Sequence, residues 1–387
     1  MSAPDTRRAE TSAPAGPFRL GYRPALDGVR ALAIVAVMAF HTSLRGTSGG
    51  FLGVVVFFVL SGFLITSLLL EELDRTQRVR LRAFYRRRAL RLYPALVVML
   101  IVTTSVALVA SPDHARHTAL NGFIALTYVA NWVIALTHWK LDFLGHTWSL
   151  AIEEQFYLLW PIALIGLTRA GKRWAIGTTA GVIVVSAAWR TLLYRPDGAG
   201  VRRVNFGFDT RLDSLMIGCL VALLLGYGYL APHASKRRGA QIVNWLAVVA
   251  LAVTILGWTA RLVPALLTVG YTVFGVLCAI VILALVRSPG TTLERGLSHP
   301  VLVWIGKRSY GLYLWHLPIF TVFDRWSHRP PLPARLAVEL VVTFAVAEAS
   351  YRWVETPFLR RKRRVADEAV TASEAAASRP SDPVVAV

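Results

Sequence analysis

Apolar segments of nearly the length that a membrane span needs recur along most of this chain, and they constrain its fold more than any other feature. A helix that crosses the hydrocarbon core of a bilayer needs roughly 20 predominantly apolar residues. The composition agrees, because 55% of the 387 residues are hydrophobic and only 17% are charged, less than the charge of a typical soluble domain. We therefore expect an all-α integral membrane protein. The eleven candidate spans lie at about 28–45, 51–70, 92–110, 119–137, 148–168, 174–190, 211–231, 241–259, 264–286, 309–324 and 333–354.

Basic residues in the short connections predict the orientation of the chain, because cytoplasmic loops carry an excess of Lys and Arg. Eleven full crossings cannot bring all the basic clusters to one face of the membrane. We expect a bundle of about ten transmembrane helices plus one re-entrant or partial helix at 119–137, where Asn121 and Asn131 interrupt the apolar run. Both termini are then cytoplasmic. The basic clusters lie at 7–23, 75–91, 169–173, 236–238 and 360–364.

A single transmembrane domain over 25–360 accounts for the folded part of the chain. Residues 1–24 are polar and lack the apolar core of a signal peptide, so we expect a disordered cytoplasmic start, and 361–387 begins basic and then has a disordered composition. The net charge of +20 follows from the topology, and no nucleic-acid-binding motif accompanies it. Cys219 and Cys278 lie in separate apolar segments, so we expect no disulfide framework, metal site or bound cofactor.

The first apolar segment carries a cation at one end and a potential base at the other. Arg30 and His41 are eleven positions apart, which places them about 16 Å apart along a helix. Ionisable residues inside a membrane span are costly and indicate function by default. The simpler alternative is that Arg30 extends to the inner surface and His41 only ends the helix.

Two adjacent carboxylates, Glu153 and Glu154, enter the apolar segment that follows His146. One interpretation is a helix start at the surface, where early carboxylates meet the positive end of the helix dipole. The other is a helix that lines a cavity, because adjacent side chains point about 100° apart. One of the two carboxylates would then face His41, orient its imidazole and stabilise the protonated ring.

Arg88 and Arg91 are three positions apart and therefore share one helix face. Paired guanidinium groups suit phosphate, and an anionic-lipid anchor is the simpler alternative. Gly50 and Gly62 lie at the start and in the middle of the second apolar segment. Glycines at such positions predict that this helix approaches its neighbours closely.

Three further groups have structural alternatives. Asp213 is expected to pair with Arg211 or Arg30 inside the bundle. His316 is either a buried, hydrogen-bonded histidine or part of a site, and Glu355 is expected to make surface pairs near the basic tail.

At these residues the chain resembles the acyltransferase family 3 membrane proteins, which are O-acyltransferases of cell-surface glycans and some antibiotics. The resemblance extends over about 25–360, and it depends on the order of the motifs more than on any one of them. The chain looks like the stand-alone form without a C-terminal esterase-like domain. The motifs are Arg30-x10-His41, Gly49-Gly50-Phe51, FFVLSGFLIT at 57–66, Arg88-x-x-Arg91, WSLAIEEQFYLLWP at 148–161, SYGLYLWHLPI at 309–319 and RWVETPF at 352–358.

The resemblance implies acyl transfer, most simply of acetyl, from cytoplasmic acyl-CoA as co-substrate to a hydroxyl of a glycan or glycosylated small molecule. It also implies residence in a bacterial plasma membrane. His41 would be the general base, with Arg30, Glu153 and Glu154 completing the catalytic set and no Ser or Cys nucleophile. The candidates for substrate binding are Arg88, Arg91, Asp27, Ser61, Tyr157, Asp213 and His316.

Several alternatives stay open from the sequence alone. Transfer is either direct or passes through an acyl-His41 intermediate. Intramembrane His and Glu are also typical of proton-coupled transporters, although no internal repeat supports a transporter of sugars or lipids. A non-catalytic membrane scaffold would tolerate replacement of Arg30, His41 and Glu153. Neither the acceptor nor the acyl chain length can be read from the residues.

Overall fold

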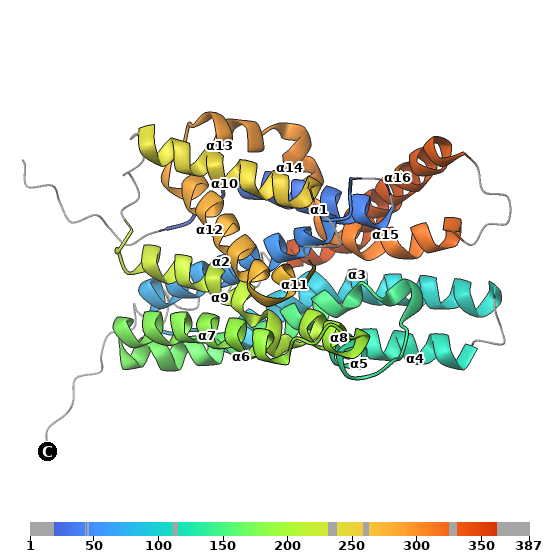
Figure 1. Ribbon diagram of the computed structural model, residues 1–387, viewed down its shortest axis with the longest axis horizontal. Coiled ribbons are helices and arrows are strands. Elements are labelled where there is room, and N and C mark those ends of the chain that lie inside the picture. The colour runs from blue at the N-terminus through green and yellow to red at the C-terminus, as the bar shows by residue number, and fades with distance from the viewer. Residues whose placement is uncertain are drawn as a thin grey trace, which may run out of the picture.

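The computed structural model describes residues 19–42, 44, 46–110, 115–230, 238–257, 263–324 and 331–361. Throughout these residues the regular elements are helices, as predicted (Figure 1). Of the predicted tails at 1–24 and 361–387, residues 1–18 and 362–387 lie outside the described residues, so their disorder stays a prediction. The basic residues Lys236 and Arg237 also lie outside the described residues, so the side of the membrane on which they lie stays a prediction.

The helices follow one another with short connections. The first half of the chain forms α1 (Pro24–His41), η1 (Gly50–Leu52), α2 (Gly53–Thr76), α3 (Leu81–Ala110), α4 (Ala115–Leu126), α5 (Ala130–Leu136), η3 (Asp142–Leu144), α6 (Thr147–Ala170) and α7 (Lys172–Leu193). The second half forms α8 (Gly198–Phe206), α9 (Phe208–Gly226), α10 (Arg238–Leu256), α11 (Val263–Ala265), η5 (Leu266–Gly270), α12 (Tyr271–Arg287), α13 (Thr292–Leu297), α14 (Pro300–Lys307), α15 (Ser309–Asp324), α16 (Leu332–Ala349) and η6 (Ser350–Glu355).

Six of the described helices are long and apolar enough to cross a membrane, or seven if the bent pair α4–α5 is one span. They are α1, η1–α2, α3, α6, α7 and the continuous run from α11 to α12. The predicted count of about ten is therefore not confirmed. α15 has only 16 residues, and α9 carries Asp209, Arg211 and Asp213 in its first two turns, so neither meets both requirements.

The stretch 119–137 does not form a straight helix, in line with its prediction as a re-entrant or partial segment. α4 and α5 meet at an angle of 116°, which fits a broken span or a re-entrant loop. A break inside a membrane must satisfy its backbone groups within the protein. Gln155 of α6 does this by donating hydrogen bonds of 2.8 Å to the Tyr128 carbonyl and to Asn131 Oδ1.

α2 and α9 lie at the centre of the bundle and touch backbone to backbone. A Cβ atom on Gly62 would lie 1.9 Å from the Leu215 carbonyl oxygen, and one on Gly218 would lie 2.0 Å from that of Val59. Gly50 is similarly close to the Ala36 carbonyl, at 2.1 Å. The close helix approach predicted from these glycines is confirmed.

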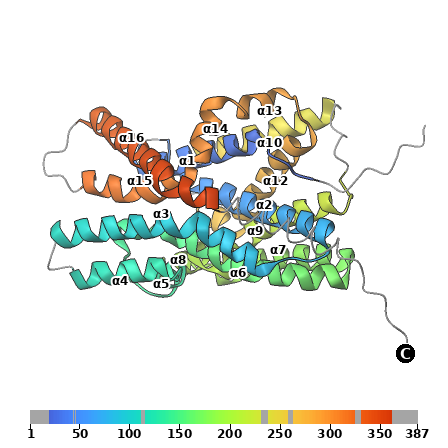
Figure 2. The same ribbon diagram turned by 180° about the vertical axis from the view of Figure 1, so that it is seen from behind.

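The central helices separate two groups of neighbours. Figures 1 and 2 show α10, α13 and α14 along one side of the bundle and α6 and α7 along the other, with α1, α2 and α9 between them. The end of α1, the start of α2 and the start of α6 approach one another, because His41, Val54 and Trp148 line one cavity. The residues singled out from the sequence therefore converge on the interior of one bundle.

Candidate active site

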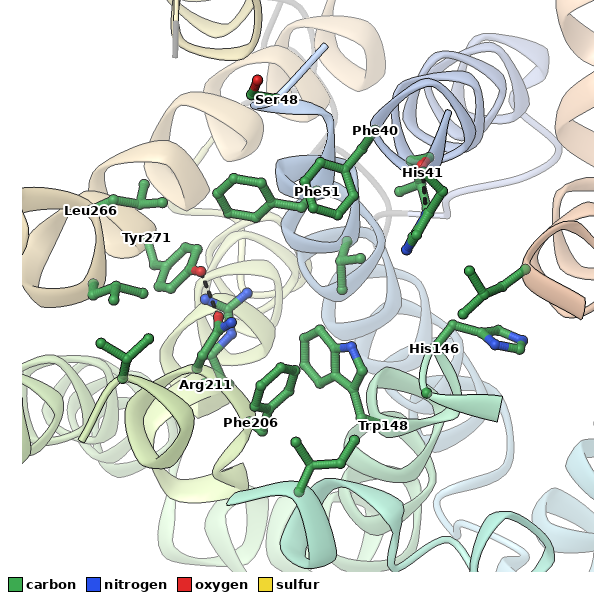
Figure 3. A pocket seen from close by; sticks show the side chains of 18 of the residues that line it. Phe40, His41, Ser48, Phe51, His146, Trp148, Phe206, Arg211, Leu266 and Tyr271 are labelled. Atoms are coloured by element: carbon green, nitrogen blue, oxygen red, sulfur yellow. Dashed lines mark hydrogen bonds between the residues drawn. The ribbon is translucent and has the colours of Figure 1, made fainter. Parts of the chain in front are cut away.

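His41 is the last residue of α1, and its orientation is set by its own helix. Its Nδ1 atom lies 2.9 Å from the Val37 carbonyl oxygen. A carbonyl only accepts, so Nδ1 carries the proton and Nε2 of the neutral ring keeps its lone pair. The ring points into a cavity (Figure 3). His41 therefore presents the atom that a general base needs.

Two more histidines form a cluster with His41, in which His316 lies between His41 and His146. The ring centroids of His41 and His316 are 5.0 Å apart, and those of His146 and His316 are 5.4 Å apart. His316 is fully buried in α15, and its Nδ1 donates to the Tyr313 carbonyl at 2.7 Å. Burial lowers the pKa of His146, which precedes the α6 span, to about 3, so this imidazole is neutral. His146 therefore places no positive charge beside His41.

The cavity in front of His41 has a volume of about 560 Å³, within the roughly 300–1,000 Å³ that is typical of small-molecule sites. Its wall is mostly apolar and carries several aromatic rings, and Arg211 is a charged residue on it. The rings include Phe40, Phe51, Trp148, Phe206 and Tyr271 (Figure 3).

A second cavity of about 220 Å³ is lined by Arg30, Arg88 and Arg91 and by the carboxylate of Glu153. Three guanidinium groups against one carboxylate leave it strongly positive. Arginine forms charge-assisted hydrogen bonds with phosphate oxygens. This cavity, which we call the basic cavity, therefore has the electrostatics of a polyanion site.

Hydrogen bonds hold the polar wall of the basic cavity in place. Ser61 Oγ donates to Glu153 Oε1 at 2.7 Å, and Tyr157 Oη donates to Ser61 Oγ at 2.9 Å. The Arg88 guanidinium lies over the Tyr157 ring, 4.4 Å from its centroid. Ser61 and Tyr157, both singled out from the sequence, thus link α2 to α6 at the carboxylate.

Val54 and Tyr313 line both cavities. Tyr313 Oη donates to the His146 carbonyl at 2.9 Å and lies 2.5 Å from Ser149 Oγ. Because the single tyrosine proton goes to the carbonyl, Ser149 is the donor in the second contact. The basic cavity and the His41 cavity therefore adjoin at a tyrosine that is held from two sides.

The prediction that Glu153 or Glu154 orients His41 is wrong. Glu153 bonds to Ser61 and faces the basic cavity, and Glu154 lines neither of the two cavities. The reason is the position of Glu153 along the helix axis. It follows His146 by seven positions, which places it roughly 10 Å farther along α6. His146, not a carboxylate, lies at the level of His41.

The predicted partners of Asp213 and the predicted exposure of Glu355 are also wrong. Asp213 pairs with Arg190 of α7 at 2.9 Å and accepts from Thr272 at 2.5 Å, and it lines neither cavity. Glu355 is only 6% exposed, and its Oε1 has no hydrogen-bond partner within the described residues.

Asp27 lies beside the cationic end of α1. It is 3.9 Å from Arg30 and accepts a hydrogen bond from Tyr22. It does not line the basic cavity, so it contacts a residue of that cavity from outside.

Sequence reasoning missed three residues of this region. His146 and Tyr313 were not singled out, and Arg211 was considered only as a partner for Asp213. The signal for His146 was its place two positions before the motif at 148–161, and the signal for Tyr313 was its place within the motif at 309–319.

Comparison with known proteins identifies relatives over most of the chain. A family profile described as an acyltransferase domain matches residues 23–351. The peptidoglycan O-acetyltransferase OatA of Listeria monocytogenes is 35% identical over 348 residues, which cover 87% of this chain and 56% of that protein. The O-acetyltransferase OatA of Staphylococcus aureus is 35% identical over 353 residues, 88% of this chain and 58% of that protein. No solved structure matches.

The chain spans a little over half the length of these curated relatives. The matched residues run from the start of α1 to η6 and include both cavities. The resemblance seen in the ordered motifs is therefore confirmed, and this multi-pass bacterial membrane protein belongs to acyltransferase family 3.

Proposed function

We propose that this protein transfers an acyl group, most simply acetyl, from cytoplasmic acyl-CoA to a hydroxyl of a carbohydrate acceptor. One observation carries the proposal: a strongly basic cavity and a histidine cavity adjoin at Val54 and Tyr313. A donor held in the first can present its thioester at the entrance of the second.

The basic cavity is the proposed donor site. Coenzyme A is a polyanion, and Arg88 and Arg91 lie near the start of α3, within the arginine-rich stretch 75–91. This position supports entry from the cytoplasmic side. The phosphates would contact these two guanidinium groups, and the pantetheine arm would extend past Arg30 toward Tyr313.

The proposed chemistry is direct transfer with His41 as general base. Nε2 takes the proton of the acceptor hydroxyl as its oxygen attacks the thioester carbonyl carbon. The carbon–sulfur bond then breaks, and the protonated imidazole returns its proton to the departing thiolate. The Val37 carbonyl holds the required tautomer.

The aromatic rings on the wall of the His41 cavity support a carbohydrate acceptor. Aromatic sites with a few polar groups are typical of small ligands that must be held in one orientation. The Listeria relative is named for action on peptidoglycan, so a cell-envelope glycan is the first acceptor to test. A sugar attached to a small molecule is the second.

The test is incubation of membranes with radiolabelled acetyl-CoA and a panel of glycan acceptors. We expect a labelled product with the wild type and a loss of at least about 100-fold with His41→Ala, because a general base contributes about 10²–10⁴-fold. Arg195→Gln is the control, since Arg195 is exposed and lines neither cavity.

Equal labelling by wild type and His41→Ala would remove His41 from the mechanism. Label that stays on the protein when acceptor is omitted would replace direct transfer with an acyl-His41 intermediate. No product with acetyl-CoA or longer acyl-CoA would contradict the proposed reaction.

A further inference from the structure

Arg211 is a buried cation on the wall of the His41 cavity, and the proposed transfer step leaves it without a role. Its side chain is 1% exposed. The guanidinium carbon lies 3.5 Å from the centroid of the Tyr271 ring and 5.7 Å from that of Phe58. Figure 3 shows Arg211 beside Tyr271, on the opposite side of the cavity from His41. Aromatic neighbours therefore hold this cation at a fixed place.

The guanidinium group of Arg211 is incompletely hydrogen-bonded. Within the part of the chain that the structure describes, neither Nε nor Nη1 has a hydrogen-bond partner. Buried polar groups without partners are uncommon, and a buried charge without compensation is costly. Such a group on a cavity wall indicates a ligand that supplies the missing acceptor.

Asp213 is two positions away from Arg211 but is committed to Arg190. Arg190 lies 2.9 Å from the Asp213 carboxylate, and its guanidinium nitrogens donate to Thr268 O, Thr210 O and Thr272 Oγ1 at 2.7–2.8 Å. Each guanidinium nitrogen of Arg190 thus has a partner within the protein, which gives this residue a structural role. The three buried residues Arg190, Arg211 and Asp213 together carry two positive charges and one negative charge.

The rest of the cavity wall separates this cation from the proposed base. Trp148 and Phe206 pack edge to face with centroids 5.0 Å apart, and Phe40 and Phe51 do so at 5.5 Å. In Figure 3 these rings lie between Arg211 on one side and His41 on the other. A ligand that spans the cavity would have its anionic end at Arg211 and another end at His41.

We propose that Arg211 binds an oxyanion of the acceptor, a carboxylate or a phosphate ester, and so selects acidic acceptor sugars. This inference rests on the proposed function, because it assigns the acceptor to the His41 cavity. The anion compensates the buried charge, the aromatic rings contact the sugar, and the reacting hydroxyl lies at His41.

The first experiment measures binding, which does not depend on turnover. Detergent-solubilised protein is titrated with methyl glucuronide, its neutral amide, glucose 6-phosphate and coenzyme A. We expect an acidic sugar to bind the wild type about 10- to 100-fold more tightly than the amide, the range for a hydrogen bond to a charged group. Arg211→Met should bind acid and amide equally, while Arg195→Gln should keep the wild-type preference.

A second variant separates charge from shape. Arg211→Lys keeps the positive charge and loses the planar group, so it should retain a reduced preference for the acid. It also serves if Arg211→Met does not yield folded protein by size-exclusion chromatography. The carboxylate and phosphate probes show which oxyanion the site prefers.

Three outcomes would overturn the inference. They are equal binding of acid and amide by the wild type, an unchanged preference in the folded Arg211 variants, and a loss of coenzyme A binding in those variants with acid binding retained. The last would mean that Arg211 serves the donor.

Transfer assays with the same sugars distinguish the two proposals. Acylation of neutral and acidic sugars with equal kcat/KM would contradict the anion site and leave the proposed function intact. An acid preference in binding without transfer to any acceptor would support the anion site and contradict the proposed function.

Discussion

Glu153 is the carboxylate that tempers the charge of the basic cavity. It lines this cavity together with Arg30, Arg88 and Arg91, and Ser61 donates a hydrogen bond to one of its oxygens. Without it, three guanidinium groups would repel one another in a site of low dielectric. With it, the cavity keeps an excess of two positive charges and a fixed arrangement, which suits a polyanionic donor.

Replacement of Arg91 by Gln should weaken donor binding more than it slows the chemical step. Loss of one charge-assisted contact to phosphate corresponds to about 10- to 100-fold in the KM for acyl-CoA, with kcat changed much less. Steady-state kinetics over a range of acetyl-CoA concentrations measure both. The effect should shrink as salt is raised, because ions screen the contact.

Arg87→Gln is the matched control for this prediction. Arg87 lies on the same helix, is paired with Glu72 at 3.0 Å and does not line the basic cavity. An equal rise in KM for both variants would mean that the overall charge of α3, and not the cavity, attracts the donor.

At the scale of the elements, the contact between α2 and α9 fixes the relative positions of residues that line the two cavities. α2 carries Val54 and Ser61, which line the cavities, and α9 carries Arg211. The two backbones approach at Gly62 and Gly218, where there is no room for a Cβ atom. A change in this spacing would move residues of both cavities at once.

Gly62→Ala should therefore destabilise the protein although alanine favours helices. Its Cβ would lie 1.9 Å from a backbone oxygen that cannot rotate away, and overpacking of this kind costs about 1–3 kcal/mol. The measurement is the apparent Tm of the solubilised protein. Gly181→Ala in α7 is the control, because nothing lies within 4 Å of the added Cβ, and it should be neutral or stabilising. Equal Tm values for the two variants would contradict the tight contact.

At the scale of the whole molecule, the features that could be predicted from the sequence are those that depend on local pattern. Apolar runs indicated the helices, and Asn131 marked the segment that breaks at α4–α5. Partners across helices could not be predicted, since 42 basic residues compete for each carboxylate and the choice of Arg190 by Asp213 depends on how α7 packs on α9. The distance of Glu153 from His41 along the bundle likewise depends on the axial position of α6 relative to α1, which the sequence does not specify.

The predicted orientation of the molecule in the membrane rests on its basic connections, and it can be tested with introduced cysteines. Cys219 and Cys278 are both buried, so a membrane-impermeant maleimide should report only on introduced cysteines. α7 has 22 residues and is about 33 Å long, enough to cross once. We expect Arg195→Cys to be labelled in intact cells and Lys172→Cys only after permeabilisation. The 169–173 turn is basic, and the proposed donor site at Arg88 and Arg91 requires access from the cytoplasm. The opposite pattern would place the basic cavity on the side that lacks its donor and would contradict both the topology and the proposed reaction.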